Sequence, residues 1–404
     1  MIYLENREDF SWLNEKNILF LERGYLTEGK TPQERVRDIA NRAEKILGKP
    51  GFADKFYNYM ARGYYSLSSP VWSNFGLDRG LPISCFGSYV GDSIAEIVST
   101  NSEIGVMSKM GGGTSGYFGH VRARGSEIKD NGKSDGSFNF AKMFDTTIDV
   151  VSQGTSRKGH FAGYMEIEHG DIEEWLNIHT EGNPIQLMHY GVSIGNDWLK
   201  DMEAGDEDKR IIWAKILQRR CETGLPYMFF RDNVNNDKPD VYNDLDMNIY
   251  ASNLCTEIML PSNEYYSFVC CLSSVNLLYY PEWKNTDAIE TLVQFLDAVL
   301  SEFIDKLRAM KNSLDPGKLE TYHYMRKALR FAEDHRAIGL GALGWHSYLQ
   351  SIKTPFDSME AMYENTKIFS FIKERSYAAS EQMAEEYGEP FLLTGYGRRH
   401  ATLN

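Results

Sequence analysis

The chain has 404 residues and a formal net charge of −14 at pH 7; 42% of the residues are hydrophobic and 25% are charged. These fractions are typical of a folded globular protein, and the length is sufficient for more than one domain. A strongly acidic chain is a poor binder of duplex nucleic acid, which requires a basic face, so we expect no nucleic-acid partner. Nucleotides remain possible ligands, because helix N-termini and single arginines bind phosphate.

Neither a membrane anchor nor a disulfide framework is expected. No stretch approaches the roughly 20 apolar residues of a membrane helix, and the first residues, MIYLENREDF, carry acids in place of an apolar run. We therefore expect no membrane partner, no signal peptide and a cytoplasmic location. The cysteines are few and show neither a CxxC pair nor zinc-type spacing with histidine, so no metal site is expected. They are Cys85, Cys221, Cys255, Cys270 and Cys271.

The first half of the chain alternates between helical and strand-like patterns. Apolar side chains recur every three to four positions in residues 13–65, which predicts helices there. A short aromatic-rich run predicts a strand near 82–90, and Asp92-Ser93 offers an N-cap for a helix over 94–108. The glycine-dense stretch 111–116 is predicted to be a turn that leads into a strand over 117–121.

The middle of the chain continues this alternation, which predicts an α/β protein with parallel strands. Strands are expected at 188–194 and 226–230, and helices at 138–151, 171–178, 195–203 and 208–222. From residue 286 onward the pattern is mainly helical. It includes a strand-to-helix turn at 338–344, a long helix at 358–387 and the start of another strand at 401–404.

One motif places a thiol between an amide and a carboxylate. Asn253, Cys255 and Glu257 alternate along the chain, so in an extended segment all three side chains would point the same way. A neighbouring carboxylate raises the pKa of a thiol, which disfavours thiolate chemistry. The set suits instead a neutral thiol that exchanges a hydrogen atom, with the carboxylate as general base. The spacing alone favours the plainer interpretation, a buried cysteine between two incidental polar residues.

Three other features carry weaker information. Cys85 and Cys270 could act as a two-electron reductant if the fold brings them within disulfide range, and otherwise they are core residues. The stretch 111–116 lacks the GxGxxG order, and Gly132-Lys133-Ser134 lacks the first glycine of a phosphate-binding loop. The donor-rich segment 152–159 is a solvated connection unless it contacts a ligand.

Taken together and in order, these segments resemble the large subunits of ribonucleotide reductases. The resemblance runs from about Ser66 to the last residue. It is carried by SLSSPVWSNFG, LPISCFGSYVGDSI, HVRARGSEI, SQGTSRKG, HYGVSI, TGLPYMFFRDNVN, NLCTEIMLP, CCLSSVNL, RAIGLGALGWHSYL and GYGRRHATL. The combination of NLCTEI with CxLSSVNL is specific to that family.

The resemblance implies a helical N-terminal region over 1–65 followed by the first portion of a ten-stranded α/β barrel over 66–404. It implies that Cys255 becomes a thiyl radical that takes the 3′ hydrogen of a ribonucleotide, with Glu257 as base and Asn253 holding the substrate. Cys85 and Cys270 would protonate the departing 2′-hydroxyl and supply two electrons. Further substrate contacts would come from Ser69, Ser84, Gly113, Leu254 and Thr256. Cys221 and Cys271 match no function in the family and are assigned to packing.

The resemblance also implies allosteric control by nucleotides. A dNTP or ATP effector would bind at a dimer interface and set substrate choice through the segment 152–159. The residues that match this site are Asp92, Ser93, Ile94, Arg122, Ile128, Gln153 and Arg157. A plain helix cap at Asp92-Ser93 is compatible with that role.

The resemblance also implies a set of partners, since members of this family work with other subunits and reductants. No cofactor is expected on this chain, and the radical would come from a metal-containing small subunit, with a thioredoxin or glutaredoxin type reductant. No ATP-binding cone precedes the helical region, so we expect no overall activity switch. Because the matched motifs stop inside the barrel, we expect a split protein completed by a C-terminal fragment, with a truncated product as the alternative. A non-catalytic dNTP-binding module and part of a cobalamin-dependent reductase are the competing functions.

Overall fold

The structure, a computed structural model, describes residues 8–151 and 158–403, and these form two compact units. The first unit holds the described residues up to Ser84, Cys270–Ala309 and those from Ala332 onward. The second unit holds the described residues of Cys85–Val269 together with Met310–Phe331. No helix among the described residues is long and apolar enough to cross a membrane.

The N-terminal part of the first unit is helical, as predicted. Its helices are α1 (Glu15–Glu22), α2 (Pro32–Leu47), α3 (Phe52–Ala61) and the short α4 (Ser69–Asn74). Thr31 begins α2 with a capping box, because its hydroxyl accepts from the N–H of Glu34 while the Glu34 carboxylate accepts from the N–H of Thr31. Phe56 of α3 stacks on Phe295 of α13 (Ala288–Lys311), with ring centroids 4.2 Å apart.

Three strands of the first unit form a small sheet. β1 (Tyr65–Leu67) pairs antiparallel with β7 (Phe268–Asn276), and β7 pairs in parallel with β8 (Ile338–Leu343). The expected strand start at 401–404 is not a regular strand where the structure describes it. Residues 402 and 403 nevertheless lie along β8, because their carbonyls accept from the N–H groups of Ile338 and Leu340.

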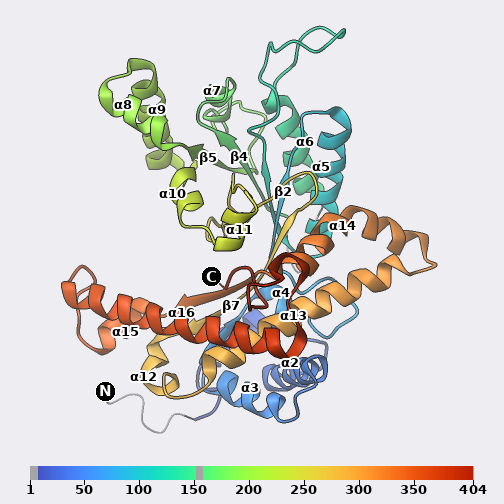
Figure 1. Cartoon of the computed structure of the whole chain (residues 1–404), viewed down its shortest axis with the longest axis vertical. Coiled ribbons are helices and arrows are strands. Elements are labelled where there is room, and N and C mark those ends of the chain that lie inside the picture. The colour runs from blue at the N-terminus through green and yellow to red at the C-terminus, as the bar shows by residue number, and fades with distance from the viewer. Residues whose placement is uncertain (1–7, 152–157, 404) are drawn as a thin grey trace. The chain divides into compact units, whose positions relative to one another are not determined.

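The rest of the first unit is helical, with the short α12 (Tyr280–Trp283) and α15 (Trp345–Ser351) and the long α16 (Met359–Tyr387). Figure 1 shows α16 as the long red helix that was predicted at 358–387. Short 3-10 turns stand at Leu277–Tyr279 and Phe391–Leu393.

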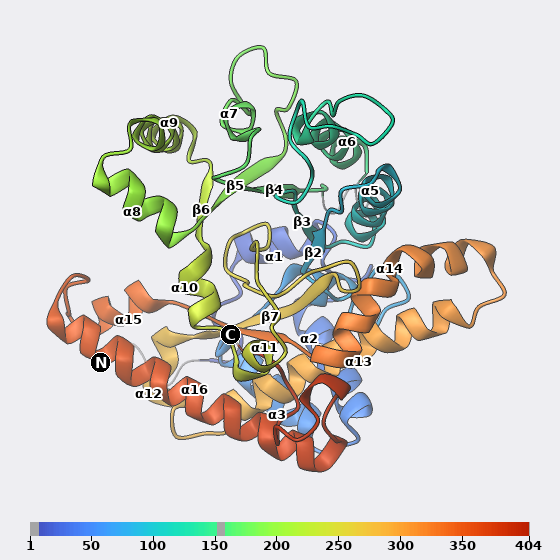
Figure 2. The same ribbon diagram turned by 45° about the horizontal axis from the view of Figure 1, so that its top comes forward.

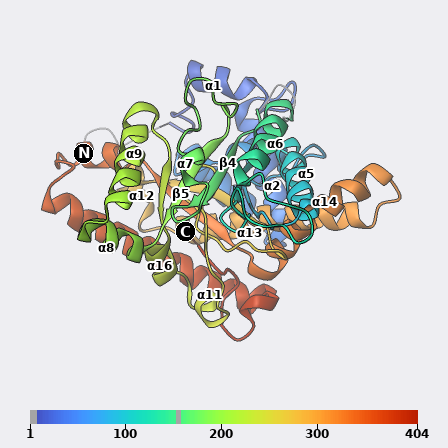
Figure 3. The same cartoon turned by 90° about the horizontal axis from the view of Figure 1, so that it is seen from above.

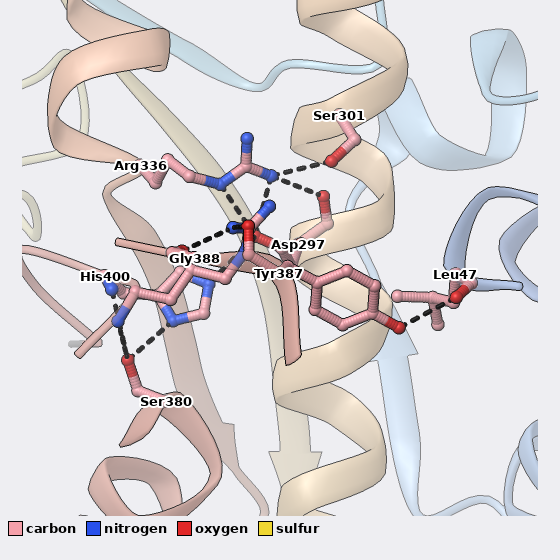
Figure 4. A network of polar contacts seen from close by, with 9 residues as sticks. Leu47, Asp297, Ser301, Arg336, Ser380, Tyr387, Gly388 and His400 are labelled. Atoms are coloured by element: carbon pink, nitrogen blue, oxygen red, sulfur yellow. Dashed lines mark hydrogen bonds and ion pairs between the residues drawn. The ribbon is translucent and has the colours of Figure 1, made fainter. Parts of the chain in front are cut away.

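A buried carboxylate joins the last described segment to α13 (Figure 4). Asp297 Oδ1 accepts from Nε of Arg336 at 2.9 Å, from Nε of Arg399 at 3.0 Å and from Nε2 of His400 at 3.1 Å. Nδ1 of His400 in turn lies 2.9 Å from the hydroxyl of Ser380 on α16. Burial alone would raise the pKa of Asp297, but the cationic groups around it hold that pKa far below its usual value. The carboxylate therefore stays charged and fixes three separate elements.

The second unit contains a sheet of five parallel strands in the order β2, β3, β4, β5, β6. The strands are β2 (Cys85–Tyr89), β3 (Gly113–Tyr117), β4 (Phe161–Glu166), β5 (His189–Ile194) and β6 (Tyr227–Phe230). The sequence predicted β2, β5 and β6 close to these bounds. It missed β4, which directly follows the segment that was interpreted only as a loop.

The glycine-rich stretch was predicted wrongly as a turn, since most of it is strand β3 and only Gly111 and Gly112 precede it. The glycines are needed because aromatic rings from neighbouring strands occupy the space of their side chains. A Cβ at Gly112 would lie 2.2 Å from the ring of Phe86, and one at Gly116 would lie 3.0 Å from the ring of Phe161. Glycine here allows close packing between strands and does not mark a turn.

Helices cover one face of this sheet. α5 (Ile94–Lys109) begins at Ser93, as predicted, and packs beside α6 (Ser137–Val150), as Figure 3 shows. Figure 2 shows α7 (Ile172–Trp175), α8 (Asn196–Ala204) and α9 (Glu207–Thr223) around the far strands. The short α10 (Arg231–Asn236) and α11 (Asp240–Asp244) follow β6, and α14 (Pro316–His335) begins in this unit. The core on this face includes Phe161, Met165, Tyr190 and Val192, so alternate residues of β4 and β5 point to the other face.

Replacing Asp297 by alanine should destabilise the chain by roughly 3–5 kcal/mol, because the buried Arg336 and the partly buried Arg399 lose their counter-charge. Asp197→Ala is the matched control, since its ion pair with Lys200 is exposed and should contribute less than about 1 kcal/mol. Chemical denaturation followed by circular dichroism measures both. Equal losses in the two variants would contradict the assigned role of Asp297.

Candidate active site

The segment that carries Cys255 is a tight hairpin and not the extended strand that the spacing suggested. Its arms are joined by a bridge between Ser252 and Met259 and by a hydrogen bond from the N–H of Asn253 to the carbonyl of Ile258 at 3.2 Å. The chain turns over residues 254–257, and Thr256 has a left-handed backbone with φ of 66°. An extended segment would place the three side chains on one face, whereas here the amide, thiol and carboxylate are arranged around a turn.

The side chain of Asn253 holds this turn together. Its Oδ1 accepts from the N–H groups of Glu257 and Ile258, both at 3.0 Å. Its Nδ2 donates to Sγ of Cys85 at 3.2 Å, which ties the turn to the first residue of β2. Asn253 is fully buried. Its amide oxygen is thus already occupied by backbone donors, and in this structure Asn253 organises the loop.

The thiol of Cys255 and the carboxylate of Glu257 lie at the tip of the hairpin. Cys255 and Glu257 are exposed, whereas Leu254 and Thr256 are partly buried. Burial, then the charges of Cys255 and Glu257, raise the pKa of Tyr227, the first residue of β6. The bond from Asn253 to Cys85, the first residue of β2, places the hairpin near the amino-terminal ends of the parallel strands. The same end carries Cys85 and Gly113, which are register partners at the starts of β2 and β3.

The structure thus brings together Cys85, Gly113, Asn253, Cys255 and Glu257 within the second unit. Leu254 and Thr256 also lie in the second unit, whereas Ser69, Ser84 and Cys270 belong to the first unit and are described there separately. Ser69 is the first residue of α4, Ser84 is buried, and Cys270 lies in β7. A Cβ at Gly339 would lie 2.9 Å from Sγ of Cys270, so a glycine on β8 makes room for that thiol. The expected pairing of Cys85 with Cys270 stays a prediction.

The residues expected to bind an effector lie at the start of α5. The carboxylate of Asp92 accepts from the backbone N–H of Arg122 at 2.7 Å and from its Nε at 2.8 Å. Ser93 is the N-cap of the helix, since its hydroxyl accepts from the N–H of Glu96, and the side chain of Ile94 is 64% exposed. Ile128 lies in a small hairpin after Arg122. Gln153 and Arg157 lie outside the described residues.

A polar cavity of about 310 Å³ at the opposite end of the strands was not indicated by the sequence. Its lining includes Tyr117 and Glu166, the last residues of β3 and β4, together with Arg231 and Tyr250. Glu166 accepts from the hydroxyl of Tyr117 at 2.7 Å and also pairs with Arg231. The sequence predicted no strand at β4, and it predicted the strand after the glycines at 117–121 in place of Gly113–Tyr117. It therefore did not indicate that the side chains lining this cavity lie together. Within the described ranges no three His, Cys, Asp or Glu side chains gather as they would around a metal ion.

Two models of one protein family match this chain. The family model for the ribonucleotide reductase all-alpha domain matches residues 12–80, and the model for the ribonucleotide reductase barrel domain matches residues 83–211 and 208–400. The chain therefore belongs to the ribonucleotide reductase large-subunit family. These matches confirm the expected fold class, a helical N-terminal domain followed by a portion of the family's α/β barrel.

Individual relatives are similar over most of this chain. The solved structure of the Actinobacillus ureae class Id ribonucleotide reductase alpha subunit is 62% identical, with a TM-score of 0.91, and the match covers 98% of this chain and 72% of that one. The putative ribonucleoside-diphosphate reductase large subunit of Frog virus 3 is 37% identical over 89% of this chain. A vitamin B12-dependent ribonucleoside-diphosphate reductase of Thermoplasma acidophilum is 30% identical over 87% of this chain. The chain spans 64% of the length of the frog virus relative and 46% of the archaeal one.

Proposed function

We propose that this chain forms the part of a ribonucleoside-diphosphate reductase that holds the radical cysteine, Cys255, and reduces ribonucleotides to deoxyribonucleotides. The observation that carries the proposal is the hairpin tip. An exposed thiol and an exposed carboxylate stand on a turn whose conformation is fixed by the buried Asn253. A thiol that exchanges a hydrogen atom must meet its substrate at close range, so it belongs on an exposed but rigid support.

Each thiol has a distinct part in the proposed chemistry. Cys255, as a thiyl radical, removes the 3′ hydrogen of the ribose, and Glu257 accepts the proton of the 3′-hydroxyl. Cys85 and Cys270 protonate the departing 2′-hydroxyl, which leaves as water, and supply the two electrons as they become a disulfide. The contact between Asn253 and Sγ of Cys85 supports the placement of one of these thiols beside the radical loop. Formation of the disulfide between Cys85 and Cys270 requires that their Cα atoms lie within about 7 Å of each other.

The radical itself is proposed to come from a metal-containing small subunit. The 62% identity to a class Id alpha subunit favours this source. The vitamin B12-dependent relative, at 30% identity, keeps a cobalamin-dependent enzyme as the alternative. A thioredoxin or glutaredoxin type protein would reduce the disulfide again, and a cytoplasmic location is part of the proposal.

Turnover is also proposed to need the remaining part of the barrel. The relatives extend beyond the region that they share with this chain, since the match covers 64% of the frog virus subunit and 72% of the class Id chain. The further barrel portion, whether on this polypeptide or on another, completes the substrate site in this proposal. Nucleotide reduction by residues 1–404 with only a small subunit and a reductant would contradict it.

Effector control is proposed at the start of α5. The ion pair of Asp92 with Arg122, the cap at Ser93 and the exposed Ile94 offer polar and apolar groups within a short stretch of chain. Exposed apolar side chains continue along α5 and α6, which pack together; they are Val98, Met143 and Val150. Such a surface suits a homodimer interface, and an effector dNTP or ATP bound at its edge would be coupled to substrate choice.

A non-catalytic dNTP-binding module is the competing function. Such a module would need the start of α5 but not the thiol and carboxylate at the hairpin tip. The two functions are distinguished by substitutions at these two places.

Cys255→Ser should abolish nucleotide reduction by the complete subunit with its small subunit, because an O–H bond is much stronger than S–H and serine cannot carry the radical. Cys221→Ser, an exposed cysteine on α9, is the matched control and should keep full turnover. Deoxynucleotide formation and effector binding are measured in both variants. Turnover in the Cys255→Ser variant would remove Cys255 from the mechanism.

Asp92→Ala and Arg122→Ala should weaken dNTP binding and blur the choice among substrates, with a coupling loss of roughly 1–3 kcal/mol. Turnover without effector should change much less. Arg124→Ala is the control, because that arginine pairs with Glu174 on the neighbouring surface. Isothermal calorimetry reports the affinities. Unchanged dNTP affinity in both test variants would show that residues 92–94 only cap the helix and do not bind the effector.

A further inference from the structure

A buried tyrosine of the central strand bonds directly to the loop that carries Cys255. The hydroxyl of Tyr164, in β4, donates to the backbone carbonyl of Asn253 at 2.8 Å. Tyr164 is fully buried and points to the face of the sheet opposite the one that α5 and α6 cover. Asn253 stands two residues before Cys255, so this bond joins the radical loop to the middle of the sheet.

The neighbouring strand is built to admit this ring. Gly191 of β5 is the register partner of Tyr164, and a Cβ at Gly191 would lie 2.4 Å from the tyrosine ring. Phe229 of β6 meets the ring edge-on with centroids 6.3 Å apart. The ring therefore lies across Gly191 with little freedom to rotate, and its hydroxyl is held at one position.

The hydroxyl is suited to a permanent donor role. Burial raises the pKa of Tyr164 well above its ordinary value, although a hydrogen bond with Ser252 opposes the shift. The group stays protonated at every physiological pH. The carbonyl that it contacts also accepts a long bond from the N–H of Thr256 at 3.3 Å, which closes the turn. Tyr164 thus donates to the Asn253 carbonyl, the same group that accepts the hydrogen bond of the turn.

We propose that Tyr164 is a positioning residue for Cys255: it fixes the height of the hairpin above the sheet without touching the substrate. The inference rests on the proposed role of Cys255. Hydrogen bonds from Tyr164 to the Asn253 carbonyl and from the Asn253 amide to Cys85 attach the hairpin to strands of the sheet. Removal of the first weakens the attachment of the hairpin to β4. Hydrogen-atom transfer is sensitive to the position of the thiol, since a misplacement of about 1 Å reduces rates roughly 100-fold.

The test is Tyr164→Phe, which removes one oxygen and keeps the ring. In the complete enzyme kcat should fall roughly 10- to 100-fold while KM for the nucleotide changes little, because Tyr164 makes no substrate contact. Alkylation of Cys255 by iodoacetamide should become several-fold faster, since the tip gains mobility. A fluorotyrosine at position 164 retains the hydroxyl and should restore both values.

Tyr190→Phe is the matched control. Tyr190 lies in the adjacent strand β5, is equally buried, and its hydroxyl has no hydrogen-bond partner among the described residues. Its loss should leave kcat and the alkylation rate of Cys255 unchanged. Equal behaviour of the two phenylalanine variants would overturn the inference. So would a matched fall of kcat and of thermal stability that fluorotyrosine does not reverse.

The role of Cys255 and the positioning role of Tyr164 can be disproved separately. If Cys255→Ser retains turnover, the proposed function is wrong, whereas the alkylation rates still report whether Tyr164 fixes the loop. If Cys255→Ser is inactive but Tyr164→Phe matches its control in kcat and alkylation, only the positioning role is wrong.

Discussion

Two backbone N–H groups, those of Glu257 and Ile258, point at one amide oxygen, and the shape of the candidate site depends on this arrangement. A turn as tight as residues 254–257 leaves its donors facing inward, where no strand partner can reach them. The Asn253 side chain satisfies them from within the loop, and each such bond in a buried place contributes about 1 kcal/mol. Its remaining amide group then contacts Cys85, so one side chain both shapes the hairpin and connects it to the sheet.

The sequence predicted the elements that follow the ordinary rules of periodicity and capping. The helix at 94–108 was marked by its serine cap, and the long helix at 358–387 by its length and pattern. The residues proposed as catalytic were identified by their match to the family's motifs and not by their spacing. The spacing of Asn253, Cys255 and Glu257 suggested a strand, while the structure shows a turn, because side-chain hydrogen bonds to the backbone are invisible in a pattern of polar and apolar residues.

Strand β3 shows why other parts of the sheet were not predictable. Its sequence, GTSGY, has almost no apolar character, yet it is buried between two strands. Large rings from β2 and β4 supply the apolar surface: Phe86 packs over Gly112, just before β3, and Phe161 packs over Gly116 within it. Local composition therefore gave the wrong answer, since the determining residues, Phe86 and Phe161, lie far away in the chain. The cavity around Glu166 escaped notice for the same reason: it depends on which strands are neighbours.

The threonine at position 256 has a consequence for how the loop balances stability against precision. A β-branched residue with φ of 66° is strained by roughly 1–3 kcal/mol, and such a conformation persists only when its surroundings over-determine it. A glycine would relieve that strain, but it would also let the turn sample several shapes in place of one. The hairpin thus stores unfavourable backbone energy at the residue after Cys255 and holds one geometry in return. The strained backbone of Thr256 lowers the stability of the folded chain, and the same restriction limits the turn to one conformation.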